Sequence, residues 1–181
     1  NSEIEATVVD LDIGNAATGD SATVGVVLGN NNSFTGETRI HGGFVEVQAN
    51  SAFSSGLVTL TGSAGIGDVA GPTTLANNVQ LDAGATLRAY GNLSLTGVIA
   101  GSGNLTTNTF GAPTTITLSG ANTYTGTTTV SGNNGTGSTL NVENTLAPPT
   151  INVETLGVLN TNGTELLENS ANVDVDGTWN L

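Results

Sequence analysis

The chain has 181 residues, of which 36% are hydrophobic and 9% are charged. Its 15 acidic residues outnumber two arginines, and there is no lysine, so the net charge is −13 and the surface should repel phosphate backbones and anionic lipids. Because of this charge, we expect no nucleic-acid partner. The absence of cysteine excludes disulfides, thiol catalysis and Cys-ligated metals.

The N-terminal stretch "EIEATVVDLDIG" (3–14) predicts a strand longer than those that follow. Its apolar residues alternate, then shift register by one residue, which predicts a bulge; they are Ile4, Ala6, Val8, Leu11 and Ile13. We treat residues 1–27 as an N-terminal strand segment that either caps the fold or pairs with another copy.

From residue 28 onward, β-type runs of three to five residues alternate with turns rich in Gly, Asn and Ser. Helix signals are almost missing, and proline occurs only between the runs. No stretch reaches the roughly 18 apolar residues of a membrane span, so we expect no membrane insertion of this segment. The sequence predicts an all-β domain over residues 28–181.

An internal repeat organises this domain. "LGNNNSFTGETRIHG" (28–42) aligns without a gap to "LSGANTYTGTTTVSG" (118–132), and the two copies extend over about 28–60 and 118–153. Because the aromatic and glycine positions persist while the polar residues drift, we interpret them as architecture rather than as a ligand loop.

Each retained position has an expected structural role. Gly126 supplies a turn with permissive dihedral angles, and Asn122 caps a turn. Tyr124 offers an apolar face with a hydroxyl that reaches solvent. The predicted turn and ladder residues are Phe34, Gly36, Asn122, Tyr124 and Gly126.

The segments "LTGVIAGSGNL" (95–105) and "ITLSGANTYTGTTTV" (116–130) resemble the passenger-associated β-strand repeat of bacterial autotransporters. The resemblance implies one right-handed parallel β-helix with coils of about 20 residues, hence about eight coils, in which each coil packs on its neighbours. It also implies an exported protein, extracellular or on the cell surface, and it carries no catalytic residues.

Catalytic chemistry finds little support in the sequence. Carbohydrate-active β-helices need paired carboxylates, whereas the aspartates here are widely scattered and the cations are Arg39 and Arg88. His41, the one histidine, follows "TRI" at a Gly-Gly turn, where we expect an exposed side chain. We predict that the chain is not an enzyme, and a carbohydrate-active enzyme is the least favoured alternative.

"NVDVDG" (172–177) partly matches the start of a calcium loop, which makes Asn172, Asp174 and Asp176 weak calcium candidates. Alternation accounts for it more simply, with Val173 and Val175 inward and the aspartates in solvent. We expect no other cofactor.

Neither end of the chain has the polar character of a solenoid cap. The C-terminal apolar residues Val173, Val175, Trp179 and Leu181, together with the N-terminal strand, are therefore predicted to self-associate. The predicted function is a non-enzymatic extracellular stalk or filament subunit that binds itself head to tail, or neighbouring repeats of a longer chain. The alternative is an adhesin or carbohydrate-binding passenger fragment with surface glycans as ligands.

Overall fold

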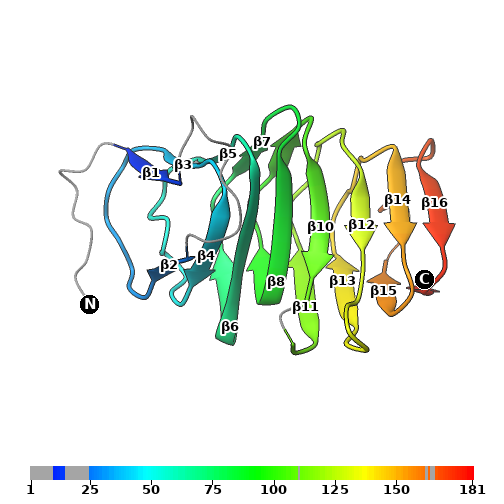
Figure 1. Cartoon of the computed structure of the whole chain (residues 1–181). Coiled ribbons are helices and arrows are strands. Elements are labelled where there is room, and N and C mark those ends of the chain that lie inside the picture. The colour runs from blue at the N-terminus through cyan, green and yellow to red at the C-terminus, as the bar shows by residue number, and fades with distance from the viewer. Residues whose placement is uncertain (1–9, 15–24, 110, 162, 164–165) are drawn as a thin grey trace.

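The computed structural model describes residues 10–14, 25–109, 111–161, 163 and 166–181, to which the following statements refer. They form 17 strands and no helix. Figure 1 shows the strands stacked along one axis, with the N-terminal strands at one end and the C-terminal strands at the other. Of the long N-terminal strand expected over 3–14, only β1 (Leu11–Ile13) falls within these residues.

The first face of the solenoid is a parallel ladder of short strands. It contains β1, β3 (Thr38–Ile40), β5 (Val58–Leu60), β7 (Val79–Leu81) and β9 (Ile99–Gly101). The Thr123 N–H continues the stack by donating to the Ile99 carbonyl, at 2.8 Å. Single parallel bridges then link Asn122, Leu146 and Leu167.

Two further faces share one sheet. The second face contains β2 (Gly25–Leu28), β4 (Gly43–Val47), β10 (Asn104–Asn108), β12 (Thr128–Val130), β14 (Thr150–Val153) and β16 (Asn172–Val175). The third contains β11 (Thr114–Leu118), β13 (Ser138–Val142), β15 (Gly157–Asn160) and β17 (Thr178–Asn180). The long strands β6 (Ser63–Leu75) and β8 (Thr86–Leu95) turn the corner and pair on both faces.

Successive turns place residues 20 to 24 positions apart in direct contact. The Ser51 N–H donates to Asn31 across 20 residues, Ile99 donates to Asn122 across 23, and Asn77 donates to Phe53 across 24. The all-β parallel solenoid is thus confirmed, but it has about seven turns rather than eight. The later turns are longer than the 20 residues on which the estimate of eight depended.

The core is a set of aliphatic ladders that run through the solenoid. Leu93, Ile116, Leu140 and Leu159 occupy one register position on the third face, and all are buried. Burial of each such side chain contributes about 1.5–3 kcal/mol. Because each one contacts mainly the coils above and below, stability is approximately a sum of neighbour terms.

The repeated aromatic residues lie inside this core. Phe34 and Tyr124 are both fully buried. The Tyr124 hydroxyl forms a hydrogen bond with the Thr128 hydroxyl at 2.5 Å, so the expectation that it reaches solvent is wrong. The ring turns into the coil, and a threonine four residues later satisfies its polar end.

Gly126 is required for a different reason from the one expected. It is not among the glycines with positive φ. A Cβ at this position would lie 2.0 Å from the Gly103 carbonyl oxygen in the preceding coil. In the first repeat copy, Gly36 lies on the other side of such a contact, since its carbonyl oxygen would lie 1.9 Å from a Cβ on Gly56 in the next coil. Close stacking of coils, not dihedral freedom, selects glycine here.

Candidate functional site

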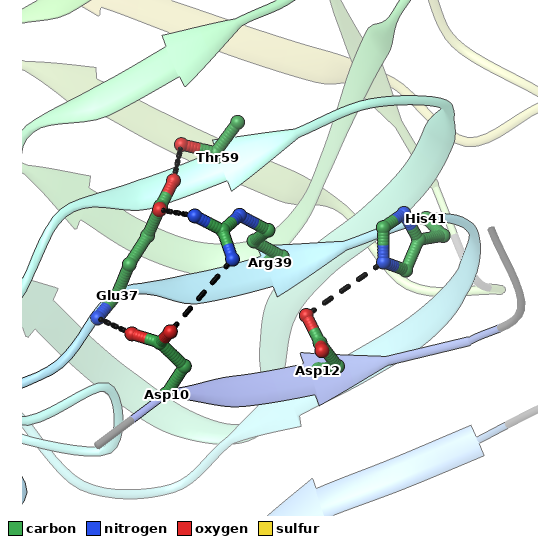
Figure 2. Close-up of polar contacts among 6 residues, drawn as sticks. All are labelled: Asp10, Asp12, Glu37, Arg39, His41 and Thr59. Atoms are coloured by element: carbon green, nitrogen blue, oxygen red, sulfur yellow. Dashed lines mark hydrogen bonds and ion pairs between the residues drawn. The ribbon is translucent and has the colours of Figure 1, made fainter.

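One group of ionisable side chains gathers on the outside of the first face together with Thr59: Asp10, Asp12, Glu37, Arg39 and His41 (Figure 2). Register pairs Asp12 on β1 with Arg39 on β3, and Arg39 with Thr59 on β5. Since side chains alternate along a strand, these three positions point away from the buried Ile13, Ile40 and Leu60.

Arg39 and Glu37 form the centre of this group. The Arg39 guanidinium donates to the Glu37 carboxylate and lies 3.8 Å from Asp10. Glu37 also accepts a hydrogen bond from the Thr59 hydroxyl, and its own N–H donates to Asp10 at 3.0 Å. The Arg39–Glu37 contact lies within one coil, whereas the contacts with Asp10 and with Thr59 join this coil to the one before it and the one after it.

His41 lies between two coils rather than in solvent. Its Nδ1 is 2.6 Å from the Thr61 hydroxyl, and its Nε2 is 3.7 Å from an Asp12 carboxylate oxygen. The side chain is only 13% exposed, so the expectation of an exposed turn residue is wrong. The parallel stack sets the adjacent coil directly beside it.

The three groups stand in the order of a catalytic triad: the Thr61 hydroxyl, the His41 imidazole and the Asp12 carboxylate. The distance from His41 to Asp12 exceeds a hydrogen bond, and the Asp12 side chain is 63% exposed. An orienting carboxylate in a triad is buried and directly bonded to the imidazole. We assign the group a structural role, with about 0–1 kcal/mol from each of its exposed ion pairs.

The strands β1 and β16, which carry self-association residues predicted from the sequence, lie at opposite ends of the solenoid (Figure 1). At the N-terminal end, Ile13 is buried and Leu11 packs against the core. At the C-terminal end the inward positions are open: Val175 is 38% exposed and Trp179 37%. Ile4, Ala6 and Val8 lie outside the described residues.

The last coil continues the register of the coils before it. Trp179 follows Leu159 in one ladder, and Val173 and Val175 follow Ile151 and Val153 in another. The Trp179 indole N–H donates to the Thr161 hydroxyl at 3.0 Å. Leu181, at 86% exposure, extends beyond β17. The apolar interior thus reaches the surface at this end.

The calcium candidates Asn172, Asp174 and Asp176 are all exposed on or beside β16. Val173 packs against the core between them, as alternation predicted. Among the residues that the structure describes, no three acidic or imidazole side chains form a metal-binding group. Calcium binding stays a prediction.

An aromatic and cationic cluster on the second face was not expected from the sequence. The Arg88 guanidinium lies 5.1 Å from the centre of the Phe44 ring, which meets Tyr90 edge to face at 6.2 Å. Gly65 lies beneath Phe44, where a Cβ would approach the ring to 2.3 Å. The signal in the sequence was the Gly-x-Gly of "AGIGD", because two glycines on the same side of a strand leave room for the aromatic rings of neighbouring coils.

Tyr90 is the buried member of this cluster. Its hydroxyl donates to the Val45 carbonyl at 3.1 Å, two coils away. Burial, followed by the negative charges of Glu46 and Asp68, raises the pKa of Tyr90 to about 12. The phenol is therefore neutral at physiological pH and acts as a fixed donor.

The comparisons with known proteins assign no family to the chain, so its class depends on the fold. No protein-family model matches the chain, and no curated protein or solved structure matches it either. None of the described residues forms a helix long and apolar enough to cross a membrane. The architecture itself defines the class: the chain is an all-β parallel β-solenoid.

Proposed function

We propose that the chain is a non-enzymatic structural solenoid of the cell surface or extracellular space, a segment of a stalk or filament that associates end to end. The resemblance to autotransporter passenger repeats supports the location. The observation that carries the proposal is the open C-terminal coil, where core positions Val175 and Trp179 are more than one-third exposed.

A parallel coil stacked on β16 and β17 would complete what these strands begin. It would pair with their free backbone groups and cover the apolar ladder positions of Val173, Val175 and Trp179. A second copy that presents its N-terminal strands offers such a coil, and so does the neighbouring repeat of a longer chain. Contacts of this head-to-tail kind do not close, so they extend into fibres.

Trp179 provides a direct test because it is the only tryptophan in the chain. We expect its fluorescence to shift to shorter wavelength, and its acrylamide quenching to fall, as protein concentration rises. Negative-stain microscopy of the same samples should show rods that lengthen at constant width. Rods of one length, with unchanged emission over a hundredfold range of concentration, would contradict the proposal.

Two valine substitutions separate an end contact from a general surface effect. Val175→Asp puts a charge on the open end, whereas Val158→Asp puts the same charge on the outward side of β15. We expect Val175→Asp to keep the protein monomeric in sedimentation velocity, and Val158→Asp to assemble as the unsubstituted chain does. Equal behaviour of the two variants would remove the end contact as the cause.

A further inference from the structure

Two hollows lie on either side of the loop 69–72, and they share Pro72 and Thr73. One has a volume of about 480 Å³ and the other about 290 Å³. We call the pair the lateral groove. Its polar lining comes from Asn31, Gln48 and Asn50 on one side of the loop, and from Ser94, Thr115 and Thr117 on the other.

The loop exists because β6 and β8 turn the same corner with different numbers of residues. Asp68 pairs with Gly91 and Thr73 with Leu93, so residues 69–72 on β6 stand opposite a single residue of β8. The extra residues project from the corner as a ridge between the two hollows.

Asp68 holds this ridge in place. Its carboxylate accepts hydrogen bonds from the N–H groups of Ala70 at 2.7 Å and Gly71 at 3.1 Å, and from the Thr73 hydroxyl at 2.6 Å. Asp68 is only 4% exposed. The one acidic residue of the groove therefore serves the loop and offers little charge to a ligand.

The remaining lining of the lateral groove carries no formal charge, although the chain has a net charge of −13. An anionic ligand would be repelled by the molecule as a whole, and a cation would find no free carboxylate in the groove. The lining suits a neutral partner that forms many hydrogen bonds.

Two amides of the groove have fixed orientations. The Asn31 side-chain oxygen accepts the Ser51 N–H at 3.1 Å, and the Asn50 oxygen accepts the Thr74 N–H at 2.9 Å. Because a backbone N–H can only donate, each amide must present its NH₂ on the other side. No hydrogen bond among the described residues occupies these two NH₂ groups. They are donors held ready for a ligand at low entropic cost.

The two hollows together extend over five coils, from Asn31 past Asn50, Thr74 and Ser94 to Thr117. Adjacent parallel strands lie about 4.8 Å apart, so this path is roughly 19 Å long. It crosses the base of the ridge at Pro72 and Thr73, which line both hollows. An extended chain of several units fits this length, whereas a single small molecule would fill only one hollow.

We propose that the lateral groove binds a neutral polysaccharide lying along the solenoid axis. Sugar hydroxyls accept hydrogen bonds from the NH₂ groups of Asn31 and Asn50, and donate to the hydroxyls of Ser94 and Thr115. This binding is independent of end-to-end association, because the groove lies on the side of the solenoid.

Affinity electrophoresis tests the class of ligand. Native gels containing mannan, dextran, galactan or arabinoxylan should retard the protein in at least one case, and gels containing polygalacturonate should not. A protein that migrates freely through all the neutral polymers, or that polygalacturonate retards equally, would overturn the proposal.

A matched pair of double variants tests the place. Ser94→Leu with Thr115→Leu removes two hydroxyls from one hollow and fills it, whereas Thr106→Leu with Thr129→Leu makes the same kind of change at outward positions on the second face. We expect the first pair to weaken binding of the retarding polysaccharide at least tenfold and the second less than twofold. Equal losses, or none, would overturn the proposal.

A further substitution keeps the test independent of loop folding. Asn50→Asp retains the oxygen that accepts the Thr74 N–H but replaces the NH₂ donor, and Asn152→Asp adds the same charge on the second face. We expect a three- to tenfold loss of affinity for Asn50→Asp alone. The proposal fails if the unsubstituted protein binds no polysaccharide and the groove variants change its sedimentation coefficient. That result would mean that the groove is a contact between copies.

Discussion

Gly126 is constrained by the coil beneath it, because a side chain there would overlap the Gly103 carbonyl oxygen. The same kind of contact occurs at Gly97 and Gly120, where a Cβ would come within 2.1 Å of a carbonyl oxygen in the previous coil. At the residue scale, these glycines therefore stand where successive coils touch backbone to backbone.

Gly126→Ala should destabilise the protein by about 2 kcal/mol or more, since the backbone of two coils must separate to admit the methyl group. Gly71→Ala is the matched control, because a Cβ at Gly71 meets no atom within 4 Å. The control should be neutral or slightly stabilising. Urea unfolding followed by circular dichroism measures both, and equal effects would refute the close-contact explanation.

The chain has two tyrosines, and both are buried. Burial raises the pKa of Tyr124 above its usual range, and it raises the pKa of Tyr90 to about 12. In the unfolded chain both phenols ionise near pH 10. Between pH 10 and 12 the unfolded state therefore binds fewer protons than the folded state.

The contribution of these two tyrosines to stability should be constant up to about pH 10 and should then fall as the pH rises toward 12. Urea unfolding at several pH values measures this, and absorbance at 295 nm should show little tyrosinate before the protein unfolds. Replacing both tyrosines with phenylalanine should flatten the profile. An unchanged slope in that double variant would show that other groups cause the loss.

At the scale of elements, the outside of the third face carries a ladder of amides. The Asn141 side chain donates to Thr117 at 3.4 Å, Asn160 donates to Asn141 at 2.8 Å, and Asn180 donates to Asn160 at 2.7 Å. Each bond joins neighbouring strands from β11 to β17. The ladder adds a side-chain connection to the backbone pairing and runs up to the open end.

Asn160→Ala should cost about 1–2 kcal/mol, because it removes two of these bonds at once. Asn152→Ala is the control: it lies on the outside of β14 at the same kind of position, and none of the described contacts includes a side-chain hydrogen bond from it. We expect the control to stay within about 0.5 kcal/mol. Chemical denaturation compares the two, and a control as costly as Asn160→Ala would contradict a role for the ladder.

At the scale of the whole molecule, the net charge of −13 acts against the compact state through self-repulsion. Only Arg39 and His41 form ion pairs with carboxylates within the described residues. Most of the negative charge is therefore uncompensated. Added salt shortens the distance over which these negative charges repel one another.

Sodium chloride should raise the melting temperature. A gain of about 1 kcal/mol between low salt and 0.5 M corresponds to roughly 2–4 °C in a chain of this size. Neutralising two exposed charges with Asp174→Asn and Asp176→Asn should reduce the salt dependence, as differential scanning calorimetry can show. A melting temperature that falls with salt would mean that the few attractive pairs outweigh the repulsion.

Short β runs, their turns and the 28–42 and 118–132 copies were sufficient to predict an all-β chain built from repeats. The parallel solenoid was predicted from the resemblance of these segments to autotransporter passenger repeats. The alternation in 172–177 was likewise sufficient to place Val173 inward. These local patterns do not give the number of residues in each turn of the solenoid. That number decides which residues of different coils become neighbours.

Only the tertiary structure decided the contacts between coils. It turned the Tyr124 hydroxyl toward Thr128, set Gly126 against Gly103, and placed His41 between Asp12 and Thr61. It also formed the lateral groove, because β6 has three more residues than β8 at their shared corner, and this difference is known only once the two strands are in register. The sequence alone determined the all-β character and the repeat of this protein, whereas the stacking of unequal coils determined its surface.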